Sequence, residues 1–269
     1  MSRVSIVKSE KPDVKQALEL IEFTPESYDL IAIKPNICAP MPYYTGATTD
    51  LRLLEEVIKF FKDTAQEIAV IESDNFSTTA EEAAEKTGVM DVCNYFEVPF
   101  VNLSSDIMIP VKNEAVKAIN NVRIPRTFLK ADFLINLPVM KTHILTDVSL
   151  GLKNMFGVSP EKKSSYHSKL SDAICDITKI RAPDLNIMDG IIGMEGKGPI
   201  SGKPKKMDLI LASTDILALD VTACRVMRIN PAYVDHIQKA AYYGLGEANP
   251  SKIEVLGESV EDVWDKFLD

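Results

Sequence analysis

Short apolar runs alternate along this chain with longer stretches in which apolar residues recur every three or four positions. The short runs have the length of buried strands, and the longer stretches have the period of amphipathic helices. Strands are predicted at residues 4–7, 30–33, 68–71, 98–103, 133–137, 185–188, 209–212 and 253–256. Helices are predicted at residues 14–23, 51–61, 79–88, 168–180, 216–227, 233–243 and 260–267.

Regular strand–helix alternation predicts an α/β fold with a mainly parallel sheet covered by helices on both faces. Residues 104–130 are polar and mixed, and residues 190–206 form a glycine-rich segment that is predicted to be a loop. Neither segment resembles a linker between domains, and no internal repeat is present. We therefore expect one domain over residues 1–269.

Composition narrows the class of protein. The chain has 269 residues, 46% of them hydrophobic, and a formal net charge of −9. An acidic total argues against nucleic-acid binding, so the basic run at residues 203–206 is interpreted as a solvated loop. No apolar run reaches the roughly 18 residues that span a bilayer, and the first residues lack the apolar core of a secretory signal. A cytoplasmic protein without membrane contact is predicted, and homo-oligomer formation is left open.

The four cysteines lie far apart in sequence, at Cys38, Cys93, Cys175 and Cys224. No pair has C-x-x-C spacing, which disfavours a local iron–sulfur or zinc site. Buried free thiols in a reducing compartment are the favoured interpretation. Cys38 stands apart because it follows a strand within a proline-rich turn.

Polar residues follow several of the predicted strands. In a parallel α/β sheet, ligands bind in the crevice outside the carboxyl ends of the strands. The residues at these positions are Lys34, Asn36, Glu72, Asp74, Asn75, Lys141, His143, Asp189 and Asp215. Polar strand ends are normal in any protein, but their recurrence predicts a shared polar crevice.

Residues 136–157 are the most informative segment of the chain. Lys141 and His143 follow an apolar strand, and Lys153 and Asn154 come later, before Gly157. Ammonium, imidazole and amide groups suit an anionic ligand. His143 is interpreted as a general acid/base or metal ligand, with a backbone-bonded loop imidazole as the alternative. Lys153 could simply end a helix, so Lys141 is the preferred anion contact.

The glycine-rich segment carries Glu195, Gly196 and Gly198. It contains neither a Walker loop nor a dinucleotide-binding fingerprint. A lid over the crevice, with Glu195 and the glycines as ligand contacts, is preferred to a mobile surface loop.

Carboxylates provide a candidate site for a divalent cation. Asp189 and Asp220 are the candidate metal ligands, together with Glu72 and His143. Asp215 is instead expected to cap the helix that follows it. Asp220 lies in an apolar stretch and therefore needs a partner, for which Lys153 or Arg225 is suitable.

Several of these segments resemble the family called domain of unknown function 362. The resemblance rests on residues 33–36, 72–75, 136–143, 151–157, 189–190, 195–199 and 213–220, in order over residues 4–257, with Lys-x-His and Gly-Leu-Lys-Asn-x-Phe-Gly as its most specific parts. The family motifs coincide here with Lys34, Asn36, Glu72, Lys141, His143, Lys153, Asn154, Asp189, Glu195 and Asp220. The resemblance implies no assigned activity. Some relatives carry a ferredoxin-like module with a four-iron cluster, and this chain lacks its cysteines.

Two functions follow from the sequence. The first is an enzyme that acts on a small carboxylate or phosphate: Lys141 and Lys153 hold the anion, His143 transfers protons, and Glu72 with Asp189 positions a divalent cation or a substrate hydroxyl. The alternative is a non-catalytic protein that binds or delivers a metal, an iron–sulfur cluster or another cofactor. The sequence does not decide whether the protein is catalytic.

Overall fold

One large sheet forms the centre of the molecule. The computed structural model describes residues 1–269 except 76, 114, 120–122, 160–162 and 269. The strand order is β12-β1-β11-β10-β7-β2-β3-β4, and β8 branches from β10 and pairs with β9. The bounds are β1 (Ser2–Lys8), β2 (Tyr28–Pro35), β3 (Ala65–Glu72), β4 (Phe100–Asn102), β7 (Phe133–Leu137), β8 (Val139–His143), β9 (Asp147–Val148), β10 (Leu185–Glu195), β11 (Lys203–Ser213) and β12 (Ile253–Gly257). A separate antiparallel ribbon consists of β5 (Met108–Pro110) and β6 (Arg123–Pro125).

The sheet is mainly parallel, as predicted. The neighbours β10-β7-β2-β3-β4 run in the same direction, whereas β11 is antiparallel to both β1 and β10. Strands β2 and β3 are buried on both faces, which explains their continuous apolar runs. In β2, Ala32 packs into one core, and Ile31 and Ile33 pack into the other.

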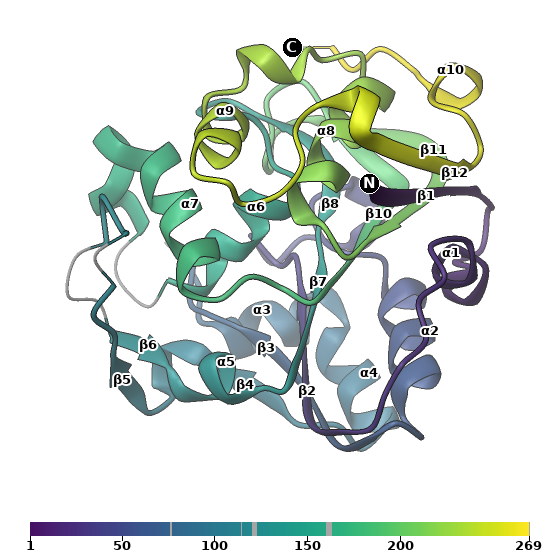
Figure 1. Ribbon diagram of the computed structural model, residues 1–269. Coiled ribbons are helices and arrows are strands. Elements are labelled where there is room, and N and C mark those ends of the chain that lie inside the picture. Colours follow the sequence, from purple (N-terminus) through teal and green to yellow (C-terminus); the bar gives the residue numbers. More distant parts are fainter. Residues whose placement is uncertain (76, 114, 120–122, 160–162, 269) are drawn as a thin grey trace.

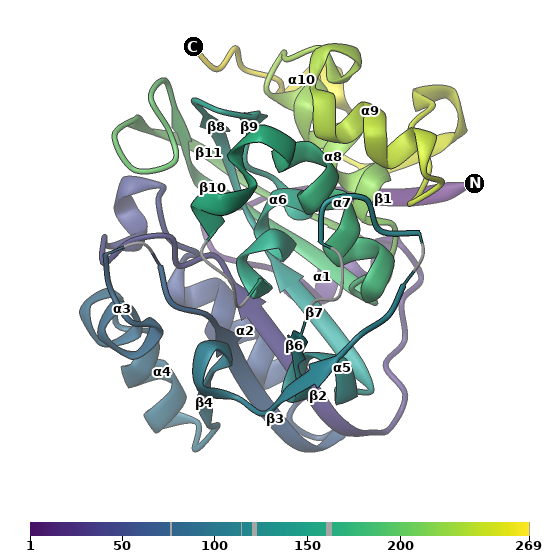
Figure 2. The ribbon, with the colours of Figure 1, turned by 90° about the vertical axis from the view of Figure 1, so that its left-hand side faces the viewer.

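Helices cover both faces of the sheet, which confirms the predicted α/β class (Figure 1). Their bounds are α1 (Val14–Leu20), α2 (Leu51–Phe61), α3 (Ala80–Thr87), α4 (Val89–Tyr95), α5 (Arg126–Lys130), α6 (Gly151–Met155), α7 (Leu170–Ile180), α8 (Ile216–Val226), α9 (Asp235–Tyr242) and α10 (Val260–Val263). Helices α1 to α4 pack on one core, and α5 to α10 contribute to the other. Figure 2 shows α6 and α7 on the near side of the sheet.

The predicted helix cap at Asp215 is present, and Asp50 caps a second helix. Asp50 accepts a hydrogen bond from the Arg52 amide at the start of α2, and Asp215 accepts from the Leu217 and Ala218 amides at the start of α8. The final helix is shorter than predicted, because α10 ends at Val263 and not at residue 267. Within the described residues, no helix combines the length and the apolar composition needed to cross a bilayer.

The glycine-rich segment at residues 190–206 is largely not a loop, contrary to the prediction. Strand β10 continues to Glu195 and returns as β11 from Lys203, so only the hairpin tip is irregular. The glycines serve close packing: a Cβ atom on Gly193 would lie 2.4 Å from the Met140 carbonyl oxygen of β8. Glycines allow the backbone of a neighbouring strand to approach closely. A strand of this kind is as rich in glycine as a loop, so composition alone does not distinguish the two.

Replacing Gly193 by alanine is expected to lower the free energy of unfolding by roughly 2–3 kcal/mol. The new methyl group would overlap a backbone oxygen, which cannot move aside as the end of a flexible side chain can. Urea unfolding measures the loss. Gly196→Ala is the control, since a Cβ there has no heavy atom within 4 Å, and strain at its positive φ of 82° costs only about 1 kcal/mol. Equal losses in the two variants would contradict the packing argument.

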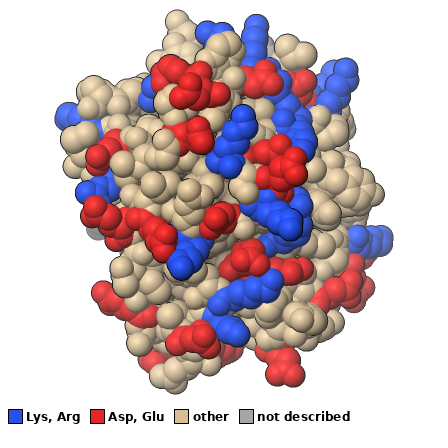
Figure 3. All heavy atoms as spheres, turned by 90° about the vertical axis from the view of Figure 1, so that its right-hand side faces the viewer, with Lys and Arg blue, Asp and Glu red and all other residues tan. Residues whose placement is uncertain are grey.

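Charges of both signs are interleaved on the face shown in Figure 3, which is the right-hand side of Figure 1. Lysines and arginines alternate there with aspartates and glutamates, and no broad region of one sign stands out on this face. Lysine side chains gather instead in the interior, at the carboxyl ends of β2 and β3.

Candidate anion site

A cavity of about 80 Å³ lies at the carboxyl ends of β2 and β3. Its lining comes from the ends of these strands, from β8, from α6 and from the tip of the β10–β11 hairpin. The polar residues of the lining are Lys34, Asn36, Cys38, Glu72, Asn75, His143, Ser149, Lys153, Asn154 and Lys163. Three lysines therefore face one carboxylate, which leaves the cavity positively charged when the lysines are protonated.

Lys34 and Glu72 form a buried ion pair at the base of the cavity. The Lys34 Nζ atom lies 2.8 Å from Glu72 Oε2, and the two side chains are 1% and 3% exposed. Lys34 also donates to the Pro35 carbonyl and to Asn154 Oδ1. Glu72 also accepts from the Ser73 and Ile37 amides. Both groups are fully engaged, so their role is to hold the ends of β2 and β3 together.

Lys153 is placed differently. Within the described part of the chain it makes no hydrogen bond or ion pair, and its Nζ atom lies 5.3 Å from the centre of the Phe156 ring. Burial, followed by the charges of Lys163 and Lys141, lowers the pKa of Lys153 to about 8. Its ammonium therefore has three unused donors and a cationic environment that a bound anion would relieve.

Lys163 approaches the same cavity from beyond α6. Its Nζ atom donates to Ser73 Oγ at 2.9 Å and to the Asp74 carbonyl at 3.0 Å. Burial is the main cause that lowers the pKa of Lys163, and the charge of Glu72 partly opposes it. No motif surrounds this lysine, so the sequence alone gave no indication that it belongs to the site.

His143 is a neutral donor in this site. Burial lowers its pKa to about 3, and the charges of Lys153 and Lys141 contribute. Its Nδ1 atom accepts a hydrogen bond from the Leu145 amide at 3.1 Å, so the neutral ring carries its proton on Nε2. The strand β8 explains the placement: alternate residues of a strand share a side, so Lys141 and His143 point the same way.

Lys141 lies behind the cavity wall. It is fully buried, and its Nζ atom donates to the Ala47 carbonyl at 2.8 Å and lies 3.3 Å from the Cys38 sulfur. Cys38 itself lines the cavity. Lys141 is therefore already hydrogen-bonded within the fold, whereas Lys153 makes no such bond among the described residues.

Amide groups complete the lining. Asn154 donates to Asn136 Oδ1 and accepts from Lys34, which fixes its orientation. Asn75 donates to the Ile37 carbonyl. The Asn36 side chain is only 8% exposed, and its Oδ1 atom has no hydrogen-bond partner. A buried, unsatisfied amide oxygen at a cavity wall is suited to a hydroxyl or amine donor on a ligand.

Most of the chain matches a known protein family. Residues 31–225 match the family described as Domain of unknown function (DUF362). The chain belongs to this family. A thylakoid-associated protein of Synechocystis sp. (strain ATCC 27184 / PCC 6803 / Kazusa) is 26% identical over 250 residues, which cover 88% of this chain and 75% of the relative. The structure of the lactate racemase apoprotein from Thermoanaerobacterium thermosaccharolyticum is similar at a TM-score of 0.45 and 16% identity, over 85% of this chain. The chain spans 57% of that racemase.

Of the ten residues that the family resemblance singled out, six line the cavity, namely Lys34, Asn36, Glu72, His143, Lys153 and Asn154. Others that the sequence analysis named lie elsewhere. Glu195 forms an ion pair with Lys205 and accepts from the Leu268 amide. Gly196 and Gly198 lie in the hairpin tip without lining the cavity, and the hairpin tip contributes Pro199 instead. The tip lies beside β8, since Gly198 accepts a hydrogen bond from the Ile144 amide.

The two predicted metal ligands of the DUF362 motifs also lie outside the cavity lining. Asp189 accepts from the Asp50 and Ile191 amides. Asp220 accepts from the Gly151 and Leu152 amides at 2.7 and 2.9 Å, so its partner is the start of α6 and not Lys153 or Arg225. Within the described residues, no three His, Cys, Asp or Glu side chains gather as a metal site. These aspartates position backbone segments.

Asp220 predicts a measurable dependence of stability on pH. Burial raises its pKa from 3.8 to about 7, against the opposing effect of the two amides. The folded state therefore retains a proton that the unfolded state loses as pH rises above about 4. Its stabilising contribution is present at low pH and is lost as pH rises through about 7. Asp220→Asn removes this dependence of stability on pH.

The Asp220→Asn variant is expected to gain roughly 2–3 kcal/mol relative to the wild type between pH 5 and pH 8. The measurement is the difference in unfolding free energy at the two pH values, obtained from urea titrations. Asp91→Asn, at an exposed position of α4, is the control. A difference that stays constant with pH would show that Asp220 is ionised throughout this range.

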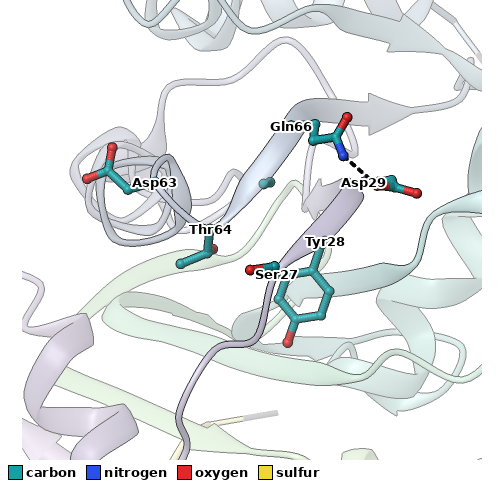
Figure 4. Close-up of a pocket in the computed structure, with 7 residues that line it drawn as sticks. Ser27, Tyr28, Asp29, Asp63, Thr64 and Gln66 are labelled. Atoms are coloured by element: carbon teal, nitrogen blue, oxygen red, sulfur yellow. Dashed lines mark hydrogen bonds between the residues drawn. The ribbon is translucent and has the colours of Figure 1, made fainter.

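A larger groove at the opposite ends of β2 and β3 has different chemistry (Figure 4). Its volume is about 250 Å³, and its lining is Ser27, Tyr28, Asp29, Asp63, Thr64, Ala65 and Gln66. Asp29 is bonded to Gln66 at 2.7 Å, and the lining contains no cation. Two aspartates and no cation line this groove, so its charge does not favour an anion.

Proposed function

We propose that the protein is an enzyme that binds a small carboxylate or phosphate in the cavity between β2, β3, β8 and α6. The observation that supports this most directly is the enclosure of three lysines and a neutral histidine with a single carboxylate in about 80 Å³. Desolvated cations with few counter-charges are stabilised by an anion, and the low local dielectric strengthens that interaction.

Lys153 is the proposed primary ligand of the anion. Its donors are unused within the described structure, and burial lowers its pKa to about 8. A group that titrates near working pH is also a suitable proton carrier. We assign Lys163 a supporting contact, since it already donates to Ser73 and to the Asp74 carbonyl.

His143 is proposed to donate a hydrogen bond from Nε2 to the bound molecule. A pKa of about 3 makes the ring neutral at pH 7 in the free protein, so donation is favoured over general-base chemistry at this stage. A bound anion would offset the neighbouring lysine charges and raise this pKa. The Lys34–Glu72 pair keeps its structural role, with Glu72 positioning Lys34 and the Ile37 amide.

The metal-dependent alternative finds less support from the side chains. Asp189 and Asp220 are each bonded to two backbone amides, and neither faces the cavity. Of the four cysteines, Cys38 borders the cavity and the other three are buried apart from it. We therefore assign no metal or cluster to this site.

Calorimetry with sulfate, inorganic phosphate and succinate tests anion binding by the full chain. We expect saturable binding with one site, competition among the three anions and loss of binding in Lys153→Met. Incubation with pooled small carboxylates and phosphates, followed by mass spectrometry, tests turnover against the same variant. Absence of binding for all three anions would overturn the proposal. Binding without turnover would leave a binding protein in place of an enzyme.

The cellular location is a separate proposal. A cytoplasmic location was predicted from the sequence, whereas the Synechocystis relative is named for its association with thylakoids. Fractionation of cells that express a tagged chain distinguishes these locations.

A further inference from the structure

Lys141 presents an unusual electrostatic situation. Its side chain is 0% exposed, and none of the carboxylates in the described structure pairs with it. Its ammonium contacts the Ala47 carbonyl oxygen at 2.8 Å and the Cys38 sulfur at 3.3 Å. A buried ammonium normally needs a counter-charge. Among the groups that Lys141 contacts, only the Cys38 sulfur is able to carry one.

The surroundings of Cys38 support both of its ionisation states. In the thiol form, the sulfur can donate to the Ala47 carbonyl at 3.4 Å or to the Pro199 carbonyl at 3.6 Å. In the thiolate form, it accepts from Lys141. A cysteine that reacts as a nucleophile needs hydrogen-bond partners in both its thiol and its thiolate form. An adjacent ammonium is a common means of activating such a cysteine.

Cys38 also borders the anion cavity. Its side chain is half-buried and lines the cavity together with His143, Lys153 and the buried, unpartnered Asn36 amide oxygen. The other three cysteines are buried, and burial raises the pKa of Cys93 and Cys175 to about 12. Cys38 is therefore the only one of the four cysteines that is not fully buried, and it lies beside the lysines of the proposed anion site.

We propose that Cys38 is a nucleophilic cysteine, whose thiolate is stabilised by contact with Lys141, that reacts with small anions carrying an electrophilic carbon. The anion preference rests on the proposed function of the cavity, whereas the reactivity of the sulfur rests on Lys141. Lys141 acts as a positioning and charge-stabilising residue, and Cys38 makes the covalent bond.

Iodoacetate and iodoacetamide provide a matched pair of probes, because they share the reacting carbon and differ in charge. In each case the thiolate electron pair forms the S–C bond, the C–I bond breaks and iodide leaves. The thiol proton passes to the solvent. The full chain is treated with each reagent, and the modified cysteine is identified by peptide mass spectrometry.

Selective modification of Cys38 is expected, at least about tenfold faster than a short unstructured cysteine peptide, with Cys93, Cys175 and Cys224 as unreactive internal references. Relative to the same peptide, iodoacetate should be favoured over iodoacetamide, and sulfate should remove that preference. Lys153→Met should slow iodoacetate more than iodoacetamide and so remove the preference for the charged reagent. Lys141→Met should slow both reagents and remove the ultraviolet absorbance of the thiolate, which Cys38→Ser also removes.

Modification of Cys38 at or below the peptide rate by both reagents would overturn the inference, even if sulfate binds. Fast modification without any preference for iodoacetate would retain the nucleophile and contradict the anion site. If Lys141→Met fails to fold, as circular dichroism would show, the wild-type rates and thiolate absorbance decide the question.

Discussion

Replacing Lys153 by methionine is expected to weaken sulfate binding at pH 7 by roughly 10- to 100-fold. A hydrogen bond from a charged donor contributes about 1.5–3 kcal/mol, which corresponds to that range of affinity. Methionine keeps the unbranched, apolar part of the side chain beside Phe156 and removes the ammonium. Calorimetry measures the change, and sulfate is used because it stays doubly negative across the pH range of interest.

The same lysine predicts the pH dependence of binding. Burial lowers the pKa of Lys153 to about 8, so the free protein loses this positive charge as pH rises through 8, and sulfate affinity should fall with it. Lys153→Met should lack this step. Lys153→Arg should retain binding at pH 9, because a guanidinium stays protonated there.

Lys15→Met, on α1 and away from the cavity, is the matched control for the change in net charge. It should leave the sulfate affinity within about twofold of the wild type, since exposed charges are screened by salt. Unchanged binding in Lys153→Met, or equal weakening in Lys15→Met, would contradict the role assigned to Lys153.

Replacing Glu72 by glutamine is expected to destabilise the fold by roughly 3–5 kcal/mol. The change removes the only carboxylate that pairs with Lys34 in the described structure and leaves an ammonium that is 1% exposed. Breaking one partner of a buried ion pair has costs of this size because the remaining charge is uncompensated. Urea unfolding measures the loss.

Glu82→Gln is the matched control for this experiment. Glu82 lies 2.6 Å from Lys86 on α3, and these two side chains are 45% and 56% exposed. An exposed pair contributes less than about 1 kcal/mol, so the control should be nearly neutral. Similar losses in the two variants would show that burial does not determine how much an ion pair contributes to the free energy of unfolding.

Sulfate offers a second measurement on Glu72→Gln. Removing the single carboxylate of the cavity increases its positive charge, so sulfate should bind more tightly than to the wild type. Binding to the folded state should then recover part of the lost stability, in proportion to the logarithm of sulfate concentration. A variant that is destabilised and also binds sulfate less tightly would indicate that Glu72 shapes the site through geometry and not through charge.

Local pattern alone predicted the main elements of the fold. The strand at residues 133–137 has the predicted bounds, and Asp215 caps the helix that follows it, as expected. These features depend on periodicity and on hydrogen bonds between close neighbours in sequence. Strand β8 and the β10–β11 hairpin were missed, since glycine and short polar strands give the same pattern as loops.

The sequence by itself determined that an α/β sheet would present lysines, an imidazole and amides near strand ends, because residue types and their strand positions are local properties. Only the tertiary structure decided how each lysine is used. Lys34 is neutralised by a carboxylate from the next strand, Lys141 meets the sulfur of Cys38, and Lys153 is left without a partner among the described residues. Charged side chains pair when the fold brings them together, and their distance along the chain does not reveal which of them will meet.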